Sequence, residues 1–453
     1  SGYRWSAKTW YKHIKYGDMI GADVKVPWEL ARMQHLPLLA KDFLFLDSQS
    51  EEAKLLVYEF RNQILDFIAT NPIRYGVNWA CTMDVAIRAS NWLLAFDIFS
   101  SKGFRFDDDF MKHFTKSVYL HARHIYKNLE WNDGNRANHY LSNICGLAFI
   151  SRYLNKSEEV DSWLSFSING LISEVGHQFY EEGTNFEGST SYHKLSTEMV
   201  LFSTCLILGI DQKRLNELAS SKKKPNARIY LLDIMSDCGK INRSPFPEWY
   251  FQRLFNMTEF MKNITKLDNT YPQIGDNDNG RFFKLEPIYE ILSLEEATYK
   301  YINLTDYKEY FAQEPYYLEK VLDTSHIQYL ASSIFSKEKF INSSFDGLVA
   351  SALMGKSNQN RFSVKIENKE RAFYKKSEID LKKRFKDDLG EKNTFYEIHF
   401  QSSKNLTEKL SLFSYPEFGL YVFKSPFLYL SVRSWKENKN IQSGHMHFDQ
   451  LSI

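Results

Sequence analysis

The residues best suited to chemistry include an Asn-His pair at the point where a loop meets a helix. In the stretch NDGNRANHYLSN, Asn138 and His139 come at the start of a predicted helix. Backbone N–H groups at a helix N-terminus favour an anion, so the two side chains could together hold a carboxylate. The alternative is structural, with Asn138 as the helix cap and His139 as an ordinary first-turn residue.

A tyrosine has a similar position farther along the chain. The small and polar residues of EEGTNFEGSTSYHKL predict a loop, after which Tyr192 and His193 open the next helix. Loops that lead into helices are common places for catalytic side chains. Glu182, Glu187 and His193 could orient or tune the Tyr192 phenol. Alternatively, Tyr192 is a helix-start aromatic residue whose hydroxyl group reaches water.

The last residues of the chain, IQSGHMHFDQLSI, contain two histidines and an aspartate at alternate positions. If this segment is a strand, His445, His447 and Asp449 lie on one face, because side chains repeat every two residues. Imidazole and carboxylate ligands suit zinc, so the pattern predicts a partial metal site at His447 and Asp449. The alternative is a polar sheet face without a metal.

Two weaker patterns lie elsewhere. Asp84, Arg88 and Asn91 share one face of the apolar stretch TMDVAIRASNWLLAF, which follows Trp79. Arg88 could line a substrate cleft together with Trp79 and Asn91, or Asp84 and Arg88 could form an i,i+4 ion pair within the helix.

The segment PQIGDNDNGRFF places Asp276, Asp278 and Asn279 close together. It lacks the full spacing and the terminal glutamate of an EF-hand calcium loop, so a turn is favoured over a calcium site.

The composition limits the classes of partner. A net charge of +1, from 57 basic and 56 acidic side chains, argues against a broad nucleic-acid or membrane-surface footprint. The 27 tyrosines and 9 tryptophans suit a sugar-binding cleft, because aromatic faces stack on sugar rings.

The four cysteines show no CxxC pairing and are typical of small buried residues. No stretch approaches a membrane span, no signal peptide is visible, and the oligomeric state stays open.

Hydrophobic periodicity divides the chain into two predicted domains. Residues 1–330 form successive amphipathic helices, one of which begins at Ser48 with Glu51 in a capping-box arrangement. About ten such helices in series predict paired helices stacked around an axis. Residues 331–453 contain short β-rich segments, among them FYEIHF, GLYVFKS and FLYLSVRSW. Because the chain ends within an apparent strand, we expect the β-sandwich to be incomplete.

Six segments in order resemble the heparinase II/III-like, alginate-lyase-like polysaccharide lyases. They are DVKVPWELARMQHLPLLA, NPIRYGVNWACTMDVAIRASNW, NRANHYLSN, NFEGSTSYH, PQIGDNDNGR and GHMHFDQLS. The resemblance implies an N-terminal (α/α) toroid, a C-terminal antiparallel β-sandwich and β-elimination on a polysaccharide that contains uronic acid. It also implies a periplasmic or secreted bacterial protein that needs no cofactor for its chemistry.

The resemblance assigns roles to individual residues. Asn138 and His139 match the family's Asn-His pair, although Ala137 stands where the family often has another Asn. Tyr192 matches the catalytic tyrosine, and His445 matches a histidine that reaches in from the sandwich. His447 matches a position that helps to bind a structural metal in some relatives, which implies a structural zinc ion.

The implied chemistry explains these residue types. Removal of the C5 proton builds charge on the uronate carboxylate, which Asn138 and His139 would neutralise. Tyr192 would act as base and acid when proton and leaving group share one side of the ring, and otherwise His139 or His445 would share the work. A phenol with a pKa of about 10 needs nearby positive charge to act as a base, and Arg88 and Arg433 are candidates for it.

Two other functions remain open at this stage. In a glycoside hydrolase, Glu182 and Glu187 would be the acid and base, with Asp276 as a third candidate. In a non-catalytic protein of surface-polysaccharide production, the same cleft, with Glu187 and His193 in its wall, would only bind glycan.

Overall fold

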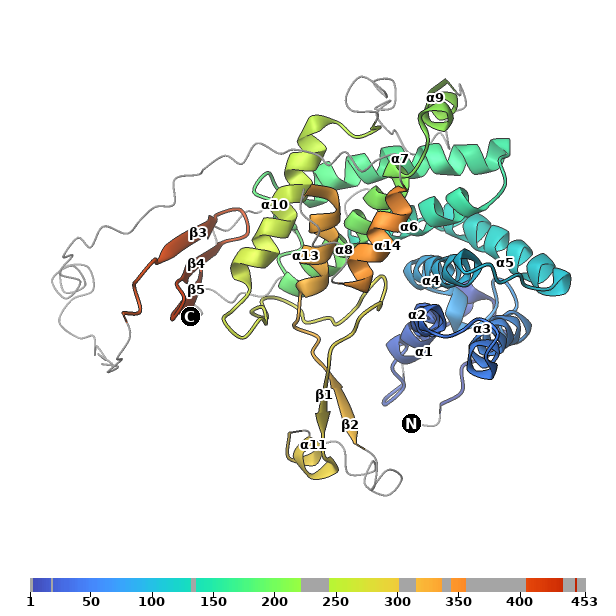
Figure 1. Ribbon diagram of the computed structural model, residues 1–453, viewed down its shortest axis with the longest axis horizontal. Coiled ribbons are helices and arrows are strands. Elements are labelled where there is room, and N and C mark those ends of the chain that lie inside the picture. Colours follow the sequence, from blue (N-terminus) through green and yellow to red (C-terminus); the bar gives the residue numbers. More distant parts are fainter. Residues whose placement is uncertain are drawn as a thin grey trace.

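The structure is a computed structural model that describes residues 3–17, 19–131, 136–220, 244–300, 315–335, 344–355, 405–434 and 445. The predicted strand FYEIHF lies outside these residues. The order of elements confirms the predicted fold class, because helices of an (α/α) toroid come first and antiparallel β-structure follows near the C-terminus (Figure 1).

The helical part begins with two short 3-10 helices and a long series of α-helices. Their bounds are η1 Tyr11–His13, α1 Lys25–Ala31, α2 Leu36–Phe45, α3 Glu51–Thr70, η2 Val77–Trp79, α4 Thr82–Ser101, α5 Asp108–Lys127, α6 Asn138–Tyr153, α7 Glu158–Gln178, α8 Thr190–Leu208, α9 Gln212–Ser220, α10 Glu248–Ile264, α11 Leu294–Lys300, α13 Ser325–Phe335 and α14 Phe345–Met354.

Two antiparallel sheets accompany these helices. Strands β1 (Tyr289–Leu292) and β2 (Tyr316–Glu319) form a two-stranded arm that projects from the helical body next to α11 (Figure 1). Strands β3 (Ser411–Tyr415), β4 (Leu420–Lys424) and β5 (Tyr429–Arg433) form a meander with β4 in the centre. The predicted strands GLYVFKS and FLYLSVRSW therefore correspond to β4 and β5.

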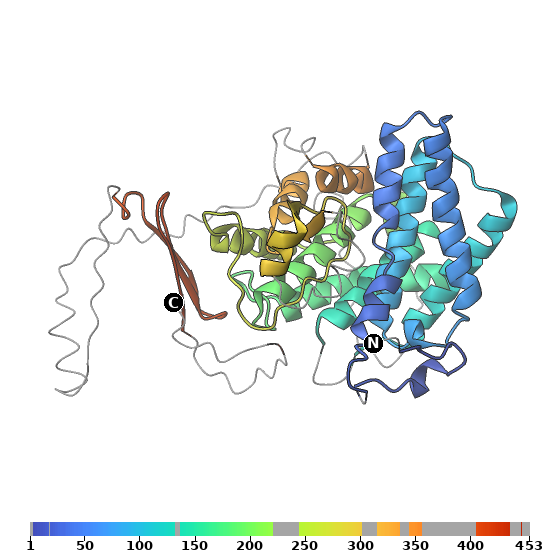
Figure 2. The same ribbon diagram turned by 90° about the horizontal axis from the view of Figure 1, so that it is seen from below.

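The core of the helical part lies around α4, α6 and α8. Helix α4 packs on α2 and α6, α6 packs on α7 and α8, and α8 also packs on α13 and α14. All side chains of α8 are buried, as expected for a helix that is surrounded by others. Seen from below, α2 to α5 stand at one side, α8 and α10 lie in the middle and the β3–β5 sheet lies at the far side (Figure 2).

Side-chain caps fix where several helices begin. The Ser50 hydroxyl accepts a hydrogen bond from the Ala53 N–H at 3.1 Å, so α3 starts at Glu51. The predicted capping box of Ser48 and Glu51 is therefore wrong by two residues. Asp107 and Ser157 cap α5 and α7 in the same way.

The predicted domain boundary at residue 330 falls inside α13. Helices α13 and α14 both pack on α8, so the helical part continues to at least Met354. Both helices bury apolar side chains, among them Ile327, Leu330 and Val349.

The β3–β5 sheet is held to the helical part by polar and aromatic contacts at the C-terminus of α10. The Tyr429 hydroxyl donates to the Ile264 carbonyl at 2.9 Å, and Lys424 Nζ donates to the Thr265 carbonyl at 2.6 Å. Phe260 packs edge-on against Tyr415 with ring centroids 4.7 Å apart. On the other side of the contact, Glu182 accepts a hydrogen bond from the Phe418 N–H at 3.0 Å.

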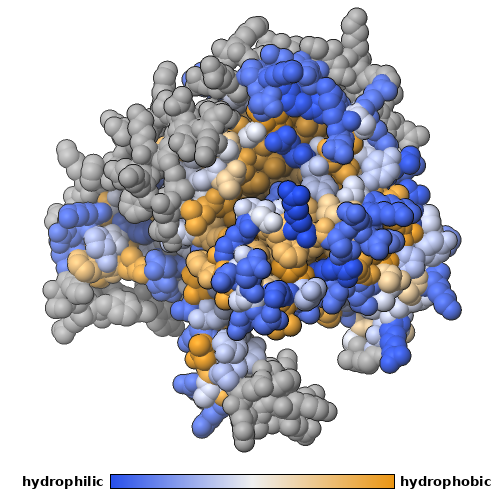
Figure 3. Space-filling view, turned by 45° about the vertical axis from the view of Figure 1, so that its right-hand side comes forward, coloured by the Kyte–Doolittle hydropathy of each residue, from blue (hydrophilic) through white to orange (hydrophobic). Residues whose placement is uncertain are grey.

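The face shown in Figure 3 has a hollow in which hydrophobic residues gather within a hydrophilic rim. Among the described residues, no single helix is long and apolar enough to cross a membrane, and only α8 with the start of α9, bent by 102°, passes the same test as a pair.

Helices α4 and α6 approach each other closely at Gly146 of α6. A Cβ atom at this position would lie 2.6 Å from Ala86 Cβ and 2.8 Å from Ala86 Cα of α4. Backbone atoms cannot move aside as a flexible side chain can. We therefore expect Gly146→Ala to lower the free energy of unfolding by about 1–3 kcal/mol, measured by chemical denaturation.

The matched control is Gly176→Ala in α7. Its Cβ would meet only the exposed edge of the Trp249 ring at 3.3 Å. Alanine favours a helix over glycine by about 1 kcal/mol, so this variant should be neutral or more stable. Equal stability of the two variants would contradict the close α4–α6 packing.

Candidate active site

Four segments far apart in the sequence meet at the N-termini of α6 and α8. They are the segment before α6, the α7–α8 loop, the loop around residues 272–281 and His445. Asn138 is the first residue of α6, and Ala137, not Asn138, is the N-cap. The Asn138 backbone N–H and Nδ2 donate to the two oxygens of Glu187 at 3.2 and 2.8 Å. Asn138 therefore binds a carboxylate, and that carboxylate belongs to the protein.

Tyr192 lies in the first turn of α8 and faces this group. Its hydroxyl donates to Asp278 Oδ2 at 3.2 Å, and its ring stacks on the His445 ring with centroids 3.8 Å apart. His445 Nδ1 is 2.9 Å from Asp276 Oδ2, and Nε2 is 3.6 Å from Glu187 Oε2. Among the predicted catalytic residues, Asn138 and His445 are thus linked through Glu187, and Tyr192 joins them by stacking on His445.

The backbone around these side chains is fixed by a close loop contact. Gly275 has a φ of +70°, and a Cβ there would lie 2.7 Å from the His445 carbonyl oxygen and 2.9 Å from the Gly188 carbonyl oxygen. The Asp276 N–H donates to the His445 carbonyl at 2.9 Å. Ser189 caps α8 and also donates its hydroxyl to the Asp276 carbonyl at 2.7 Å. Only glycine fits at position 275 without moving this junction.

Burial and negative charge control the protonation of Tyr192 and Glu187. Burial, followed by the charge of Asp278 and the hydrogen bond to it, raises the pKa of Tyr192 well above its usual value. Burial also raises the pKa of Glu187, although hydrogen bonds from Asn138 and the charge of His445 oppose the shift. At neutral pH the Tyr192 phenol therefore carries its proton.

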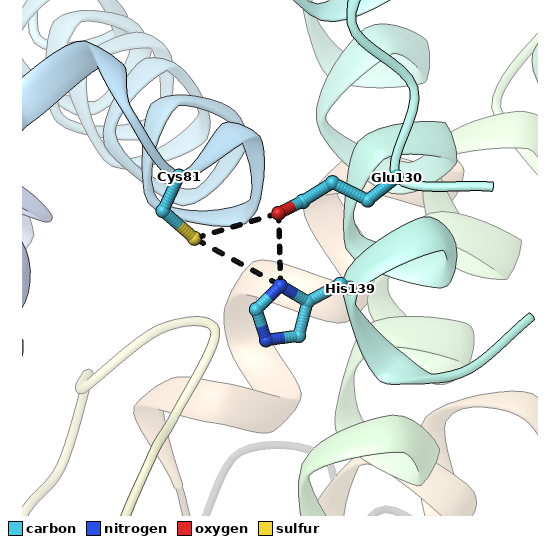
Figure 4. A group of neighbouring side chains, drawn as sticks. All are labelled: Cys81, Glu130 and His139. Atoms are coloured by element: carbon cyan, nitrogen blue, oxygen red, sulfur yellow. Dashed lines mark hydrogen bonds and ion pairs between the residues drawn. The ribbon is translucent and has the colours of Figure 1, made fainter. Parts of the chain in front are cut away.

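His139 lies on the outer side of α6 and forms a second group with Glu130 and Cys81 (Figure 4). Its Nδ1 is 3.0 Å from Glu130 Oε1, and Cys81 Sγ lies 3.7 Å from the same oxygen and 3.8 Å from Nδ1. Glu130 Oε2 accepts hydrogen bonds from the Met83 N–H at 2.8 Å and Asn143 Nδ2 at 3.1 Å. The glutamate is therefore held in place on both of its oxygens.

The His139 side chain is 47% exposed, so it is the reachable member of this group. Partial burial lowers the pKa of His139, but the hydrogen bond and charge of Glu130 outweigh this effect and the net shift is upward. Burial, with the charges of Asp84 and Glu130, raises the pKa of the Cys81 thiol well above its ordinary value.

A family model for the heparinase II/III N-terminus matches residues 4–234 of the chain. The chain belongs to the heparinase II/III family. The comparison with curated proteins gives no match.

Solved structures of heparinases and heparan sulfate lyases are similar to the chain. Heparan sulfate lyase HepC from Pedobacter heparinus is 17% identical over 72% of this chain and 42% of its own, with a TM-score of 0.36. The heparinase III BT4657 gene product is 20% identical over 72% of this chain and 46% of its own, with a TM-score of 0.37. A third structure, heparinase III, is 15% identical over 70% of this chain and 40% of its own, with a TM-score of 0.38. The chain spans less than half the length of these proteins.

In this member of the heparinase II/III family, three residues predicted to bind substrate lie in the helical core. Arg88 is fully buried, where Nε donates to His121 Nε2 at 3.1 Å and the guanidinium stacks on Phe67 and Trp79. Trp79 itself is 1% exposed and donates to the Asn71 carbonyl at 3.2 Å. Asn91 is also fully buried. Asp84 pairs with Arg32 at 2.6 Å, so the predicted pair within α4 is replaced by a contact to α1's C-terminus.

Burial lowers the pKa of Arg88 to about 9, although Asp84 opposes the shift. A buried arginine in this setting stabilises the core through stacking and hydrogen bonds. It does not reach the group around Tyr192, and the face of α4 that carries Arg88 and Asn91 points into the toroid wall instead.

His193 and Arg433 are also held away from the group. His193 is fully buried, its Nε2 is 3.1 Å from the Met257 carbonyl, and burial lowers its pKa to about 3. Arg433 ends β5, is 3% exposed, stacks on the Phe418 ring at 4.6 Å and donates to the Phe418 carbonyl. The predicted metal ligands His447 and Asp449 lie outside the described residues, and their site stays a prediction.

The sequence pattern assigns no role to Glu130, Cys81 or Asp278. Asp278 lies in the loop before β1, and its carboxylate accepts a hydrogen bond from the Tyr192 hydroxyl. A cavity of about 290 Å³ lies between α8, α13 and the β1–β2 arm, and none of the predicted catalytic or binding residues lines it.

The contact between Glu130 and His139 can be tested by titration of the His139 ring. Removal of the Glu130 charge should lower the pKa of His139, because the carboxylate stabilises the protonated ring. We expect Glu130→Gln to move the His139 titration, followed by NMR of its ring protons, to lower pH.

Glu159→Gln is the matched control, because this exposed glutamate bonds Tyr119 and Arg123 on the far side of α5. It should leave the His139 titration unchanged. If Glu130→Gln also leaves it unchanged, the Glu130–His139 hydrogen bond is absent in solution.

Proposed function

We propose that the protein cleaves a uronic-acid-containing polysaccharide by β-elimination. The observation that carries this proposal is the meeting of Asn138, Tyr192 and His445 around Glu187, with His139 next to Asn138 at the start of α6. These residues come from segments up to several hundred positions apart, and ordinary core packing does not require a tyrosine, two histidines and an amide at one place. Family membership supports the same reaction class.

His139 is the proposed partner of the uronate carboxylate. Its ring is exposed, and Glu130 favours the protonated form by raising its pKa. Positive charge at this point would stabilise the carboxylate as negative charge develops after loss of the C5 proton. Asn138 is 1% exposed and its amide binds Glu187, so in this proposal Asn138 fixes the site and shares only its remaining hydrogen-bonding capacity with substrate.

Tyr192 is the proposed proton donor to the leaving glycosidic oxygen. Its raised pKa keeps the phenol protonated at neutral pH, as an acid requires. Positive charge from Arg88 or Arg433, which would favour a phenolate base, is absent beside it, since both side chains are committed elsewhere. His445 is then the candidate base, because Asp276 orients its ring through Nδ1 and Nε2 remains on the Glu187 side.

The hydrolase alternative has less support. A glycosidase needs two carboxyl groups facing each other across the scissile bond. Glu182 accepts hydrogen bonds from the backbone of the β3–β4 turn at 3.0 and 3.3 Å, so it holds the sheet. Glu187 and Asp276 both contact the His445 ring, which occupies the space between them. A protein that only binds glycan would not need the Tyr192–Asp278 contact.

Elimination creates an unsaturated uronate that absorbs ultraviolet light, and hydrolysis does not. We expect absorbance to rise over time on one member of a panel of heparan sulfate, chondroitin, hyaluronan, alginate and bacterial capsular glycans. Tyr192→Phe should reduce the initial rate at least about 100-fold, because it removes the proton donor and leaves the ring stacking in place.

Tyr119→Phe is the matched control, since the Tyr119 hydroxyl bonds Glu159 on the outside of the toroid. It should retain the wild-type rate. A Tyr192→Phe variant as active as wild type would remove Tyr192 from the mechanism. Saturated products, identified by mass analysis, would mean that the protein acts by hydrolysis and not by elimination.

A further inference from the structure

The Cys81–Glu130–His139 group has the geometry of a metal site. Tetrahedral zinc, with bonds of about 2.3 Å to sulfur and about 2.0–2.2 Å to nitrogen and oxygen, places N and O ligands about 3.4 Å apart and S about 3.6 Å from either. The corresponding atoms here are 3.0, 3.7 and 3.8 Å apart (Figure 4). Each separation is within about 0.4 Å of the tetrahedral value, so small side-chain movements suffice to admit an ion.

We propose that Cys81 Sγ, Glu130 Oε1 and His139 Nδ1 form a three-ligand site for a zinc-like divalent transition metal. Thiolate, imidazole and carboxylate are the three ligand types that zinc takes in proteins. Three protein ligands leave a fourth position for water or another small ligand, as in catalytic zinc sites.

Two of the ligands are held by their surroundings. The Met83 N–H and Asn143 Nδ2 bind Glu130 Oε2, which leaves Oε1 directed at His139 and Cys81. The Glu130 backbone N–H donates in turn to Asn143 Oδ1 at 2.8 Å. Such outer hydrogen bonds orient metal ligands and strengthen metal binding. Cys81 is 5% exposed and directly precedes α4, so its position is set by the helix.

The exchange of protons for a metal ion balances in charge. When His139 is protonated, the metal-free group consists of a thiol, an imidazolium and an ionised Glu130, with no net charge. Binding breaks the S–H bond and the Nδ1–H bond, releases both protons to solvent, and forms metal bonds to sulfur, nitrogen and oxygen. The metal-bound group of thiolate, neutral imidazole, carboxylate and divalent ion again has no net charge.

The electrostatic surroundings favour a cation. Asp84 and Glu187 add negative charge near His139, and the charged groups facing them include Arg32, which pairs with Asp84 at 2.6 Å. The exposed His139 ring gives an ion a route to the buried thiol. A bound metal would keep Nε2 protonated, so that this N–H could donate to the uronate carboxylate that we place there. That consequence depends on the proposed function, but metal binding itself does not.

Cobalt(II) can report the site, because a thiolate bound to cobalt gives a charge-transfer absorption that oxygen and nitrogen ligands do not. We expect chelator-treated protein to bind about one equivalent of Co²⁺ with this absorption, and Zn²⁺ to displace the cobalt and abolish it. Cys81→Ser should remove the absorption, and Glu130→Gln should weaken binding at least about tenfold.

Cys145→Ala is the matched control. Cys145 is fully buried in α6, and its thiol contacts the Met199 carbonyl at 3.7 Å. This variant should keep the absorption. His139→Ala, at a half-exposed position, tests the site if Cys81→Ser does not fold, and it should also lose binding.

Two results would overturn the proposal. One is a wild-type protein that gives no thiolate–cobalt absorption at stoichiometric Co²⁺, which would leave the group as a hydrogen-bonded Glu–His pair. The other is an absorption that survives in folded Cys81→Ser or His139→Ala protein. Lyase activity is not needed for this measurement, so failure of the elimination proposal and failure of the metal proposal are separate outcomes.

Discussion

The arrangement of the whole site depends on the buried carboxylate of Glu187. This side chain is 1% exposed, and a carboxylate removed from water is tolerated only where donors replace its hydration. The donors are the backbone and side-chain amides of Asn138, with the His445 ring near the same oxygen. One carboxylate therefore ties the start of α6 to the α7–α8 loop and to His445. Without these donors the buried charge would be unfavourable, and the start of α6, the α7–α8 loop and His445 would lose the contact that holds them together.

The same principle resolves an apparent conflict of charge. The site that we propose for an acidic polysaccharide is surrounded by acidic side chains, which alone would repel such a substrate. Each of them, however, is paired: Glu130 with His139, Asp276 with His445, and Asp278 with the Tyr192 hydroxyl and, at 3.9 Å, with Lys25. Each acid orients the basic or hydroxyl group that it contacts. The His139 ring is 47% exposed, and the hydrogen bond and charge of Glu130 shift its pKa upward.

The sequence was sufficient to predict the fold class and the residues at helix starts. Asn138 and Tyr192 stand where a polar loop turns into an apolar helix, a pattern that local sequence contains. The sequence was insufficient to predict the direction in which individual side chains point. His193 follows Tyr192 by about 100° around α8, so when Tyr192 faces the loops, His193 must face the core. Periodicity likewise placed Arg88 and Asn91 on one face of α4, but which neighbour covers that face depends on packing between α2, α4 and α6.

Glu130 shows a different limit. It lies in a short connection, and only the fold brings it to His139 and Cys81, the latter 49 positions away. Once these contacts are known, two proposed roles of His139 exclude each other. A metal on Nδ1 leaves Nε2 as an N–H donor, which can bind a carboxylate but cannot accept the C5 proton. Metal-bound His139 would therefore serve only to hydrogen-bond the carboxylate. Since Tyr192 keeps its proton as well, abstraction of the C5 proton would then fall to His445, whose Nδ1 contact with Asp276 gives it the orientation that a base needs.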